Sequence, residues 1–211
     1  MADMVQRIVQ RLYKGEIETV AELVQDALDV GMAPREILKD ALLTGMDEVG
    51  RDFKVGDLFV PEVMFAARAM QAGMDVLRPL LADSDMASAG KCIMGTVKGD
   101  LHDIGKNLVK MMLDGGGFEA IDLGVDLDPE IFVEAVREHQ PDVVGMSALL
   151  TTTMVQMKAT IVALEEAGLR DSVKIMIGGA PVTAAFAEQI GADAYAPDAA
   201  SAVDLARELV A

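Results

Sequence analysis

The residues best suited to chemistry in this chain are Asp100 and His102, in the run Asp-Leu-His-Asp-Ile-Gly at residues 100–105. A carboxylate two residues before a histidine can accept a hydrogen bond from one imidazole nitrogen, which fixes the tautomer and leaves the other nitrogen to face a metal. One histidine cannot hold a bare metal ion, but it can be the axial ligand of a metal whose equatorial bonds come from a macrocycle. The pair therefore favours a metal held in a macrocycle.

Two further clusters of hydroxyl-bearing residues and glycines each follow a predicted strand. Ser147, Leu149 and residues 151–153 follow one strand, and Gly178 with Gly179 follows the next. Because ligands of open α/β sheets bind beyond the carboxyl ends of the strands, we expect all three clusters at one edge of the sheet. Glycines there let a ligand approach the backbone, and hydroxyls can bind a polar tail. Taken singly, the clusters are also explained by helix capping and ordinary turns.

The first 80 residues carry apolar side chains at helix spacing, which predicts four helices joined by short connections and hence a small bundle. Gly31 is expected to follow the second helix, and Pro34 suits the first turn of a third that runs as one element to Phe53. Pro61 similarly opens the fourth helix.

The next stretch, residues 81–90, is small and polar without an apolar period, which predicts a linker. We therefore expect a helical domain at residues 1–82, a linker at 83–90 and a second domain at 91–211.

In the second domain, short apolar runs alternate with helical stretches. The predicted strands cover residues 92–97, 120–123, 143–147, 173–177 and 194–196, and the predicted helices cover 105–113, 129–138, 153–167, 184–190 and 200–210. Apolar strands joined by helices are typical of a parallel sheet with helices on both faces. The sequence predicts a Rossmann-like, flavodoxin-like domain with five parallel strands.

The charge and composition of the chain argue against several classes of function. The formal net charge is −17 and no basic cluster is present, so a nucleic-acid partner is not expected. The lone cysteine, Cys92, cannot form an intrachain disulfide and fits a reducing compartment. The start resembles no secretion signal and no apolar run has transmembrane length, so we expect a cytoplasmic protein without a membrane partner.

The motifs together resemble those of cobalamin-binding corrinoid proteins of methyltransferase systems, and of the cap and cobalamin module of cobalamin-dependent methionine synthase. The resemblance covers essentially all 211 residues in the same order. It implies cobalamin as the cofactor, as methylcobalamin or hydroxocobalamin, with His102 displacing the cofactor's own base to become the axial ligand of cobalt. Asp100 and Thr153 would continue a hydrogen-bond relay; methionine synthase has serine where this chain has Thr153.

The same resemblance implies two further groups of cofactor-binding residues. In the second domain these are Asp103, Ile104, Gly105, Ser147, Leu149, Thr151, Gly178, Gly179, Tyr195 and Asp198. In the helical domain, Phe53, Val60 and Val63 would cover the methyl face of the corrin; methionine synthase has leucine at the position of Val60. Core packing alone also explains these three residues.

The family likeness implies a methyl carrier that is a non-autonomous subunit. No residue set in the chain is suited to activate a methyl donor, so we expect a donor-specific methyltransferase as one partner. A second methyltransferase would pass the methyl group to tetrahydrofolate or a thiol, with a reductive activase as an optional third partner. Cobalt exchanges the methyl group while the protein binds, orients and protects the cofactor.

Three other functions remain open from the sequence. A cobalamin-dependent sensor would share the cap and the motif but normally needs a signalling output. A mutase subunit would share the second domain but leaves no role for the helical bundle. A nucleotide-binding protein without cobalamin would make the motif matches coincidental.

Overall fold

The computed structural model describes residues 2–81 and 89–211. They form two compact units: a helical one that contains residues 2–81, and a sheet-containing one that contains residues 89–114 and 118–211. Of the linker predicted at residues 83–90, only Ala89 and Gly90 are among the described residues.

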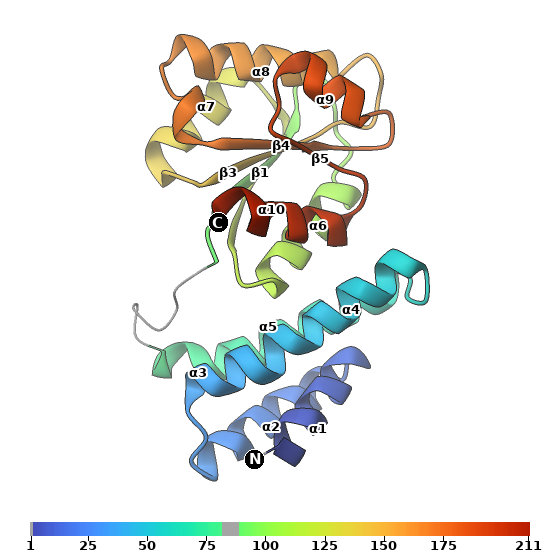
Figure 1. The fold of residues 1–211 in the computed structure, drawn as a ribbon, viewed down its shortest axis with the longest axis vertical. Helices are drawn as coiled ribbons and strands as arrows, with labels where there is room; N and C mark the ends of the chain where they lie inside the picture. The colour runs from blue at the N-terminus through green and yellow to red at the C-terminus, as the bar shows by residue number, and fades with distance from the viewer. Residues whose placement is uncertain (1, 82–88) are drawn as a thin grey trace. The chain divides into compact units, whose positions relative to one another are not determined.

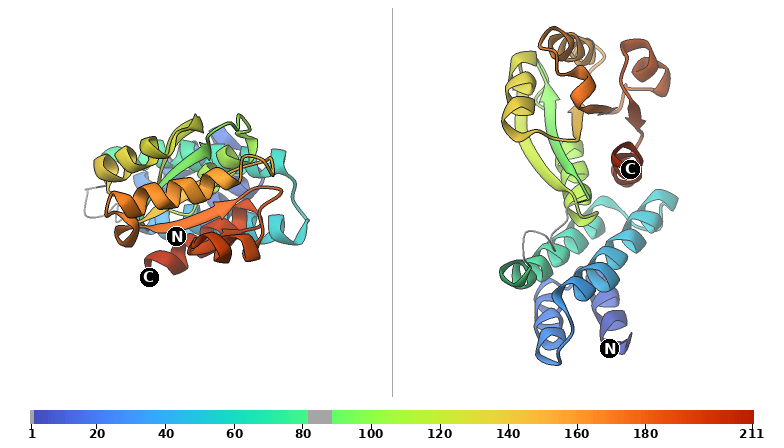
Figure 2. Two further views of the ribbon diagram at one scale, coloured as in Figure 1. Left: turned by 90° about the horizontal axis from the view of Figure 1, so that it is seen from above. Right: turned by 60° about the vertical axis from the view of Figure 1, so that its left-hand side comes forward.

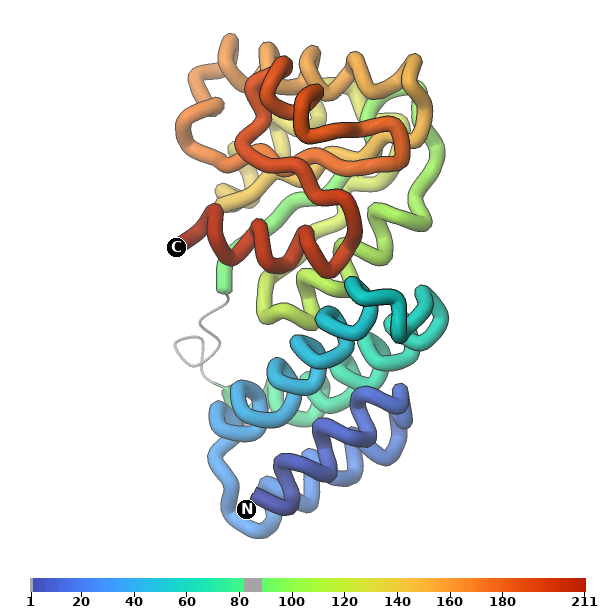
Figure 3. Tube along the Cα trace, turned by 45° about the vertical axis from the view of Figure 1, so that its right-hand side comes forward, coloured from blue at the N-terminus to red at the C-terminus, as the bar shows by residue number. Residues whose placement is uncertain are grey.

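The helical unit contains four long helical stretches, which Figures 1 and 3 show in blue to cyan. Its elements are α1 (Ala2–Tyr13), α2 (Ile17–Asp29), α3 (Pro34–Glu36), the π-helix η1 (Ile37–Leu43), α4 (Thr44–Val55), α5 (Val60–Leu77) and the short 3-10 helix η2 (Arg78–Leu80). Gly73 in α5 permits close packing, because a Cβ there would lie 3.0 Å from Leu42 and 3.3 Å from Val20. The apolar faces of these helices form one core.

The third helix differs from its predicted form. The sequence predicts one regular helix from Pro34 to Phe53, but the structure has a π-helical segment within it. In a π-helix the hydrogen bonds join residues five apart. The side chains of residues i, i+4 and i+5 therefore lie on the same face of the helix. Ile37, Ala41 and Leu42 follow this spacing and are all fully buried. A regular α-helix would turn Leu42 further away from Ile37.

The second unit is built on five parallel strands in the order β2-β1-β3-β4-β5. The strands are β1 (Lys91–Val97), β2 (Glu119–Leu127), β3 (Val143–Ser147), β4 (Lys174–Gly178) and β5 (Ala194–Ala196). The helices are α6 (Ile104–Gly115), α7 (Pro129–His139), α8 (Val155–Glu166), α9 (Ala184–Ile190) and α10 (Ala199–Val210), with the 3-10 helix η3 (Arg170–Ser172) before β4. The predicted fold class, a helical bundle followed by a Rossmann-like five-stranded parallel sheet, is confirmed.

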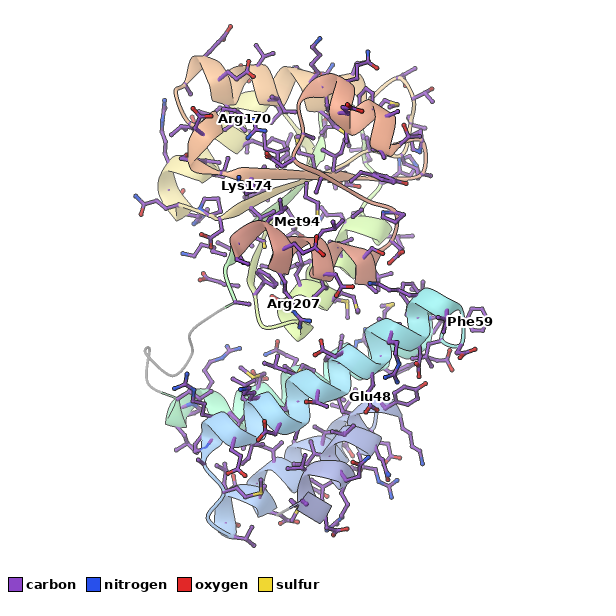
Figure 4. The ribbon with its side chains drawn as sticks, in the orientation of Figure 1. Glu48, Phe59, Met94, Arg170, Lys174 and Arg207 are labelled. Atoms are coloured by element: carbon purple, nitrogen blue, oxygen red, sulfur yellow. The ribbon has the colours of Figure 1, made fainter. Side chains whose placement is uncertain are left out.

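The helices cover both faces of this sheet. Helices α7, α8 and α9 lie on one face, and α6 and α10 lie on the other (Figures 1 and 2). On the α10 side, the Met94 side chain lies over β3 (Figure 4), where a Cβ on Gly145 would come within 2.2 Å of its Sδ. The central strands β1 and β3 are almost entirely buried, as expected for a sheet covered on both faces.

The single cysteine lies within this core. Cys92 in β1 has no exposed surface. Burial, together with the nearby Asp142 and Asp114 carboxylates, raises the pKa of its thiol to about 12. Cys92 is therefore a buried apolar side chain and not a reactive nucleophile.

Across residues 2–81 and 89–211, no helix combines the length and the apolar character needed to cross a bilayer.

Candidate functional site

The register of the sheet aligns the ends of the three strands that precede the predicted clusters. Thr96 of β1 lies opposite Ser147 of β3, and Ser147 lies opposite Gly178 of β4. The loops that follow these strands therefore leave the sheet at the same edge. Parallel strands place their carboxyl ends together, which is why residues about 50 positions apart in sequence meet here.

His102 is held at this edge by Asp100. The imidazole Nδ1 lies 2.7 Å from Oδ1 of Asp100, and the His102 backbone N–H donates to the same oxygen at 3.1 Å. A carboxylate can only accept here, so Nδ1 donates, and in the neutral ring Nε2 is the nitrogen that carries the lone pair. The His102 side chain is 52% exposed, and no hydrogen bond from the described part of the chain occupies Nε2. The ring is oriented and has one nitrogen available to a ligand.

The second oxygen of Asp100 is held by the β3–α8 loop. Oδ2 accepts hydrogen bonds from the Thr153 hydroxyl at 2.6 Å and from the backbone N–H groups of Leu149 at 2.8 Å and Leu150 at 3.3 Å. Burial raises the pKa of the Asp100 carboxyl, but the hydrogen bonds from Thr153, Leu149 and His102 outweigh it and hold that pKa well below its usual range. Asp100 is a buried carboxylate, and it stays ionised near neutral pH.

The Thr153 hydroxyl has two acceptors within reach. Besides Asp100, it lies 2.9 Å from the carbonyl oxygen of Leu150. A hydroxyl has one proton to donate, and the shorter contact with the charged oxygen is the stronger bond. Threonine at this position therefore makes the hydroxyl contact that the relay requires.

Two buried polar residues that the sequence analysis did not single out also support the motif. Thr96 is fully buried in β1, and its hydroxyl donates to the carbonyl oxygen of His102 at 3.0 Å. Lys106 in the first turn of α6 is only 1% exposed and pairs with Asp122 of β2, which fastens the start of that helix to the sheet. Lys110 follows one turn later in α6, so a lysine at position 106 does not stand out in the sequence as a buried residue.

Apolar side chains near His102 are unusually exposed. Leu101 is 70% exposed and Ile104 is 79% exposed, and Leu149 and Leu150 in the neighbouring loop are more than 40% exposed. Gly105 has nothing within 4 Å of the position of a Cβ. An ionised relay surrounded by exposed apolar side chains suits a large, flat, largely apolar ligand that is bonded at one point.

The paired glycines have a local structural explanation. Gly179 has φ +130°, and a Cβ there would lie 1.9 Å from the carbonyl oxygen of Ala148. A Cβ on Gly178 would lie 3.0 Å from the Ala196 carbonyl oxygen. Close packing of the β3 and β4 ends therefore requires Gly179 whether or not a ligand binds nearby.

The remaining predicted residues of this unit differ in whether their side chains already have a structural role in the protein. Ser147 and Thr151 lie at the same edge and have no side-chain hydrogen bond to any described residue, whereas Asp103 accepts one from Asn107 at 3.0 Å. Tyr195 packs partly against the core. Asp198 caps α10 by accepting from the backbone N–H of Ser201 at 2.7 Å.

The three predicted cap residues belong to the helical unit. Phe53 in α4 and Val60 at the start of α5 are half-buried, and Val63 is fully buried. Core packing accounts for Val63. The connection between α4 and α5 also carries Phe59, whose ring is 69% exposed and projects outward in Figure 4.

The available metal ligands suit a metal whose other bonds come from a macrocycle. Among residues 2–81 and 89–211, no group of three or more His, Cys, Asp or Glu side chains could hold a metal ion. His102 offers a single imidazole nitrogen, backed by a carboxylate that fixes its tautomer. This arrangement fits an axial ligand of a macrocyclic metal.

Both units of the chain match known protein families. Residues 90–204 match a family described as the B12 binding domain, and residues 4–78 match a second family with the same description. The first match alone covers more than half of the chain.

The chain is also similar over nearly its whole length to individual corrinoid proteins. The chain is 44% identical over 210 residues to a dimethylamine corrinoid protein of Methanosarcina barkeri, covering 99% of this chain and 98% of that protein. It is 40% identical over 210 residues to a corrinoid protein of Desulfitobacterium hafniense strain Y51, covering 98% of this chain and 97% of the other.

Solved structures extend the likeness to the fold. A chain of the methanol:cobalamin methyltransferase complex MtaBC from Methanosarcina barkeri matches with a TM-score of 0.89 at 31% identity, covering 99% of this chain and 80% of that one. A cobalamin-binding protein from Desulfitobacterium hafniense DCB-2 matches with a TM-score of 0.83 at 34% identity, covering 98% of each.

Proposed function

Because this chain belongs to the B12-binding family of corrinoid proteins, we propose that it carries methyl groups on a bound cobalamin between two methyltransferases. The observation that carries the proposal is His102, whose Nδ1 is held by Asp100 at 2.7 Å and whose Nε2 has its lone pair available at the half-exposed end of the ring. Cobalamin, when bound, supplies a cobalt centre that can accept a methyl group and yield it again.

Within this proposal, the relay residues set the axial ligand. His102 would offer Nε2 to the cobalt, while Asp100 fixes the tautomer and the orientation of the ring. Thr153 and the backbone N–H groups of Leu149 and Leu150 keep Asp100 ionised, so the imidazole always faces a hydrogen-bond acceptor. Leu101 and Ile104 would cover apolar parts of the corrin and exclude water there.

The other predicted residues would hold the rest of the cofactor. Ser147, Leu149, Thr151, Gly178 and Gly179 lie at the strand ends beside the relay, where the nucleotide tail would pass. Asp103, Gly105, Tyr195 and Asp198 would border the corrin and the displaced base. From the helical unit, Phe53, Val60 and Val63 would shield the methyl face until a partner binds.

Two partner methyltransferases, with a reductive activase as an optional third partner, follow from the same proposal. The names of relatives 40–49% identical to the chain include dimethylamine and trimethylamine corrinoid proteins, which favours a methylated amine as the donor that the first methyltransferase activates. A second methyltransferase would deliver the methyl group to tetrahydrofolate or a thiol, and a reductive activase would restore cobalt after accidental oxidation. We place this system in the cytoplasm, a compartment that fits a chain with one unpaired cysteine.

Electron paramagnetic resonance of the cobalt(II) protein tests the proposal. Protein produced with ¹⁵N-histidine and reconstituted with hydroxocobalamin should show superhyperfine coupling to a ¹⁵N nucleus, because His102 replaces the base of the cofactor. His102→Ala should lose this coupling, whereas His139→Ala, which changes a histidine in the last turn of α7, should keep it. Coupling to ¹⁴N of the cofactor base in the wild-type protein would contradict the assignment.

A further inference from the structure

Asp126, near the end of β2, makes two hydrogen bonds to the backbone of Gly99 and Asp100. Its carboxylate Oδ1 accepts the backbone N–H of Gly99 at 2.7 Å, and its own backbone N–H donates to the carbonyl oxygen of Asp100 at 3.0 Å. The β3–α8 loop and Thr153 hold only the side chain of Asp100. Asp126 therefore holds the backbone of the residue whose carboxylate the β3–α8 loop holds.

The backbone conformation of Asp126 is unusual. Its φ is +55°, and in the described part of the chain the only other non-glycine residue with positive φ is Gln140. Gln140 has an ordinary reason, because it ends α7 as a left-handed cap. Asp126 ends no helix, and left-handed backbone is uncommon for residues other than glycine, although asparagine and aspartate adopt it more readily.

The pairing of β1 and β2 shows how this conformation arises. Their register shifts between Met94 and Gly95 and again between Gly95 and Val97, so β2 departs from the regular ladder near its end. Past the last paired residue of β1, the chain turns through Gly99, which has φ +78°. The left-handed turn at Asp126 directs both its N–H and its carboxylate at this turn, and the result is two hydrogen bonds, one with the N–H of Gly99 and one with the carbonyl oxygen of Asp100.

We propose that Asp126 is a positioning residue for the axial ligand: by holding the backbone N–H of Gly99 and the backbone carbonyl of Asp100, it sets where Asp100 holds the His102 ring. The use of these two hydrogen bonds in cobalt ligation depends on the proposed function, but both bonds join residues of the protein itself. Among the described residues, Asp126 makes no hydrogen bond to the His102 ring, so it acts through Asp100.

Three variants separate the acceptor from the backbone conformation. Asp126→Gly removes the acceptor and adopts positive φ without strain. Asp126→Asn keeps an Oδ1 acceptor and the tolerance for positive φ. Asp128→Asn is the matched control, because Asp128 is two residues further along and pairs with Lys98, the neighbour of Gly99, on the surface.

The first measurement is amide hydrogen exchange of Gly99 in the protein without cobalamin. Asp126→Gly should speed this exchange at least about fivefold, as expected for loss of one hydrogen bond to a charged acceptor. Asp126→Asn and Asp128→Asn should remain close to the wild-type rate. An unchanged Gly99 rate in Asp126→Gly, or an Asp126→Asn rate as fast as that of Asp126→Gly, would overturn the positioning role.

The second measurement is the ¹⁵N-histidine coupling of the cobalt(II) form. Asp126→Gly should give a mixture of histidine-ligated and cofactor-base-ligated cobalt, while Asp126→Asn and Asp128→Asn give the wild-type spectrum. A wild-type spectrum in Asp126→Gly would also overturn the positioning role. Absence of histidine coupling in the wild-type protein would instead overturn the proposed function, so the two failures are distinguishable.

Discussion

Oγ1 of Thr153 lies 2.6 Å from Oδ2 of Asp100, although the residues are 53 positions apart and follow different strands. The contact joins the loop after β1 to the loop after β3, the two neighbouring central strands of the sheet. The hydrogen bond is made between residues of the protein itself, and it holds the carboxylate that orients the His102 ring. Preorganisation of this kind lowers the entropic cost of binding.

Thr153→Val tests this contact by replacing the hydroxyl with a methyl group. We expect the free energy of unfolding to fall by about 1.5–3 kcal/mol, because a buried carboxylate loses a charge-assisted hydrogen bond. Thr153→Ser keeps the hydroxyl and should cost less than about 1 kcal/mol, the loss of one methyl group. Chemical denaturation of both variants measures the difference, and equal losses would show that the methyl group is what matters.

The stability of the protein should depend on pH through Asp100. The pKa of this carboxyl is lowered in the folded state relative to about 3.9 in the unfolded chain. A lowered folded pKa stabilises the protein above the unfolded value, and this contribution is lost as the pH falls below about 4 toward the folded pKa.

Thermal unfolding between about pH 3 and pH 6 should therefore show a steeper loss of Tm in the wild-type protein than in Asp100→Asn. The comparison is needed because the pKa values of Asp122 and Asp52 are also lowered. Parallel Tm profiles for the two proteins would argue against a depressed pKa at Asp100.

Two glycine-to-alanine variants should separate packing from ligand approach. Gly179→Ala should destabilise the protein by about 3 kcal/mol or more, because the new Cβ would overlap the Ala148 carbonyl oxygen at a positive φ. Gly105→Ala has open space around its Cβ in the first turn of α6, so stability should be unchanged or higher by up to about 1 kcal/mol.

The Gly105→Ala protein should nevertheless bind hydroxocobalamin more weakly, because the added methyl group stands where we propose the corrin lies. Equilibrium titration followed by the visible spectrum gives the Kd of each protein. Wild-type affinity in a folded Gly105→Ala protein would remove Gly105 from the binding surface.

Cys92 should not react with thiol reagents in the folded protein. Its thiol is fully buried, and its pKa is raised to about 12, so the thiolate that reacts is almost absent at neutral pH. Incubation with iodoacetamide followed by mass spectrometry should show no labelling without denaturant and one label per chain in it. Rapid native labelling would mean that β1 opens readily.

The sequence predicts most elements of the sheet unit because each signal is local. The bounds of β3, α9 and β5 agree with the predicted runs, since apolar strands alternate there with helices that have clear starts and ends. β2 extends to Leu127, four residues beyond its predicted end at 123, because its polar and glycine-containing second half pairs with β1 through an irregular register. Hydrophobic pattern alone does not report such pairing.

The site was predictable to the extent that its residues form a recognisable motif. Asp100, His102 and Thr153 carry that motif, and the hydrogen bonds expected between them are present. The supporting roles of Thr96 and Asp126 depend on where backbone atoms lie after the chain has folded. A threonine in a strand and an aspartate near a strand end look ordinary in sequence, so nothing local points to them.

The sealed position of Cys92 makes this chain a convenient substrate for site-specific labelling. A single cysteine introduced at an exposed position would be the sole thiol that a fluorophore or a spin label can reach in the folded protein. Cofactor loading and partner docking could then be followed by fluorescence or pulsed dipolar spectroscopy without first building a cysteine-free background.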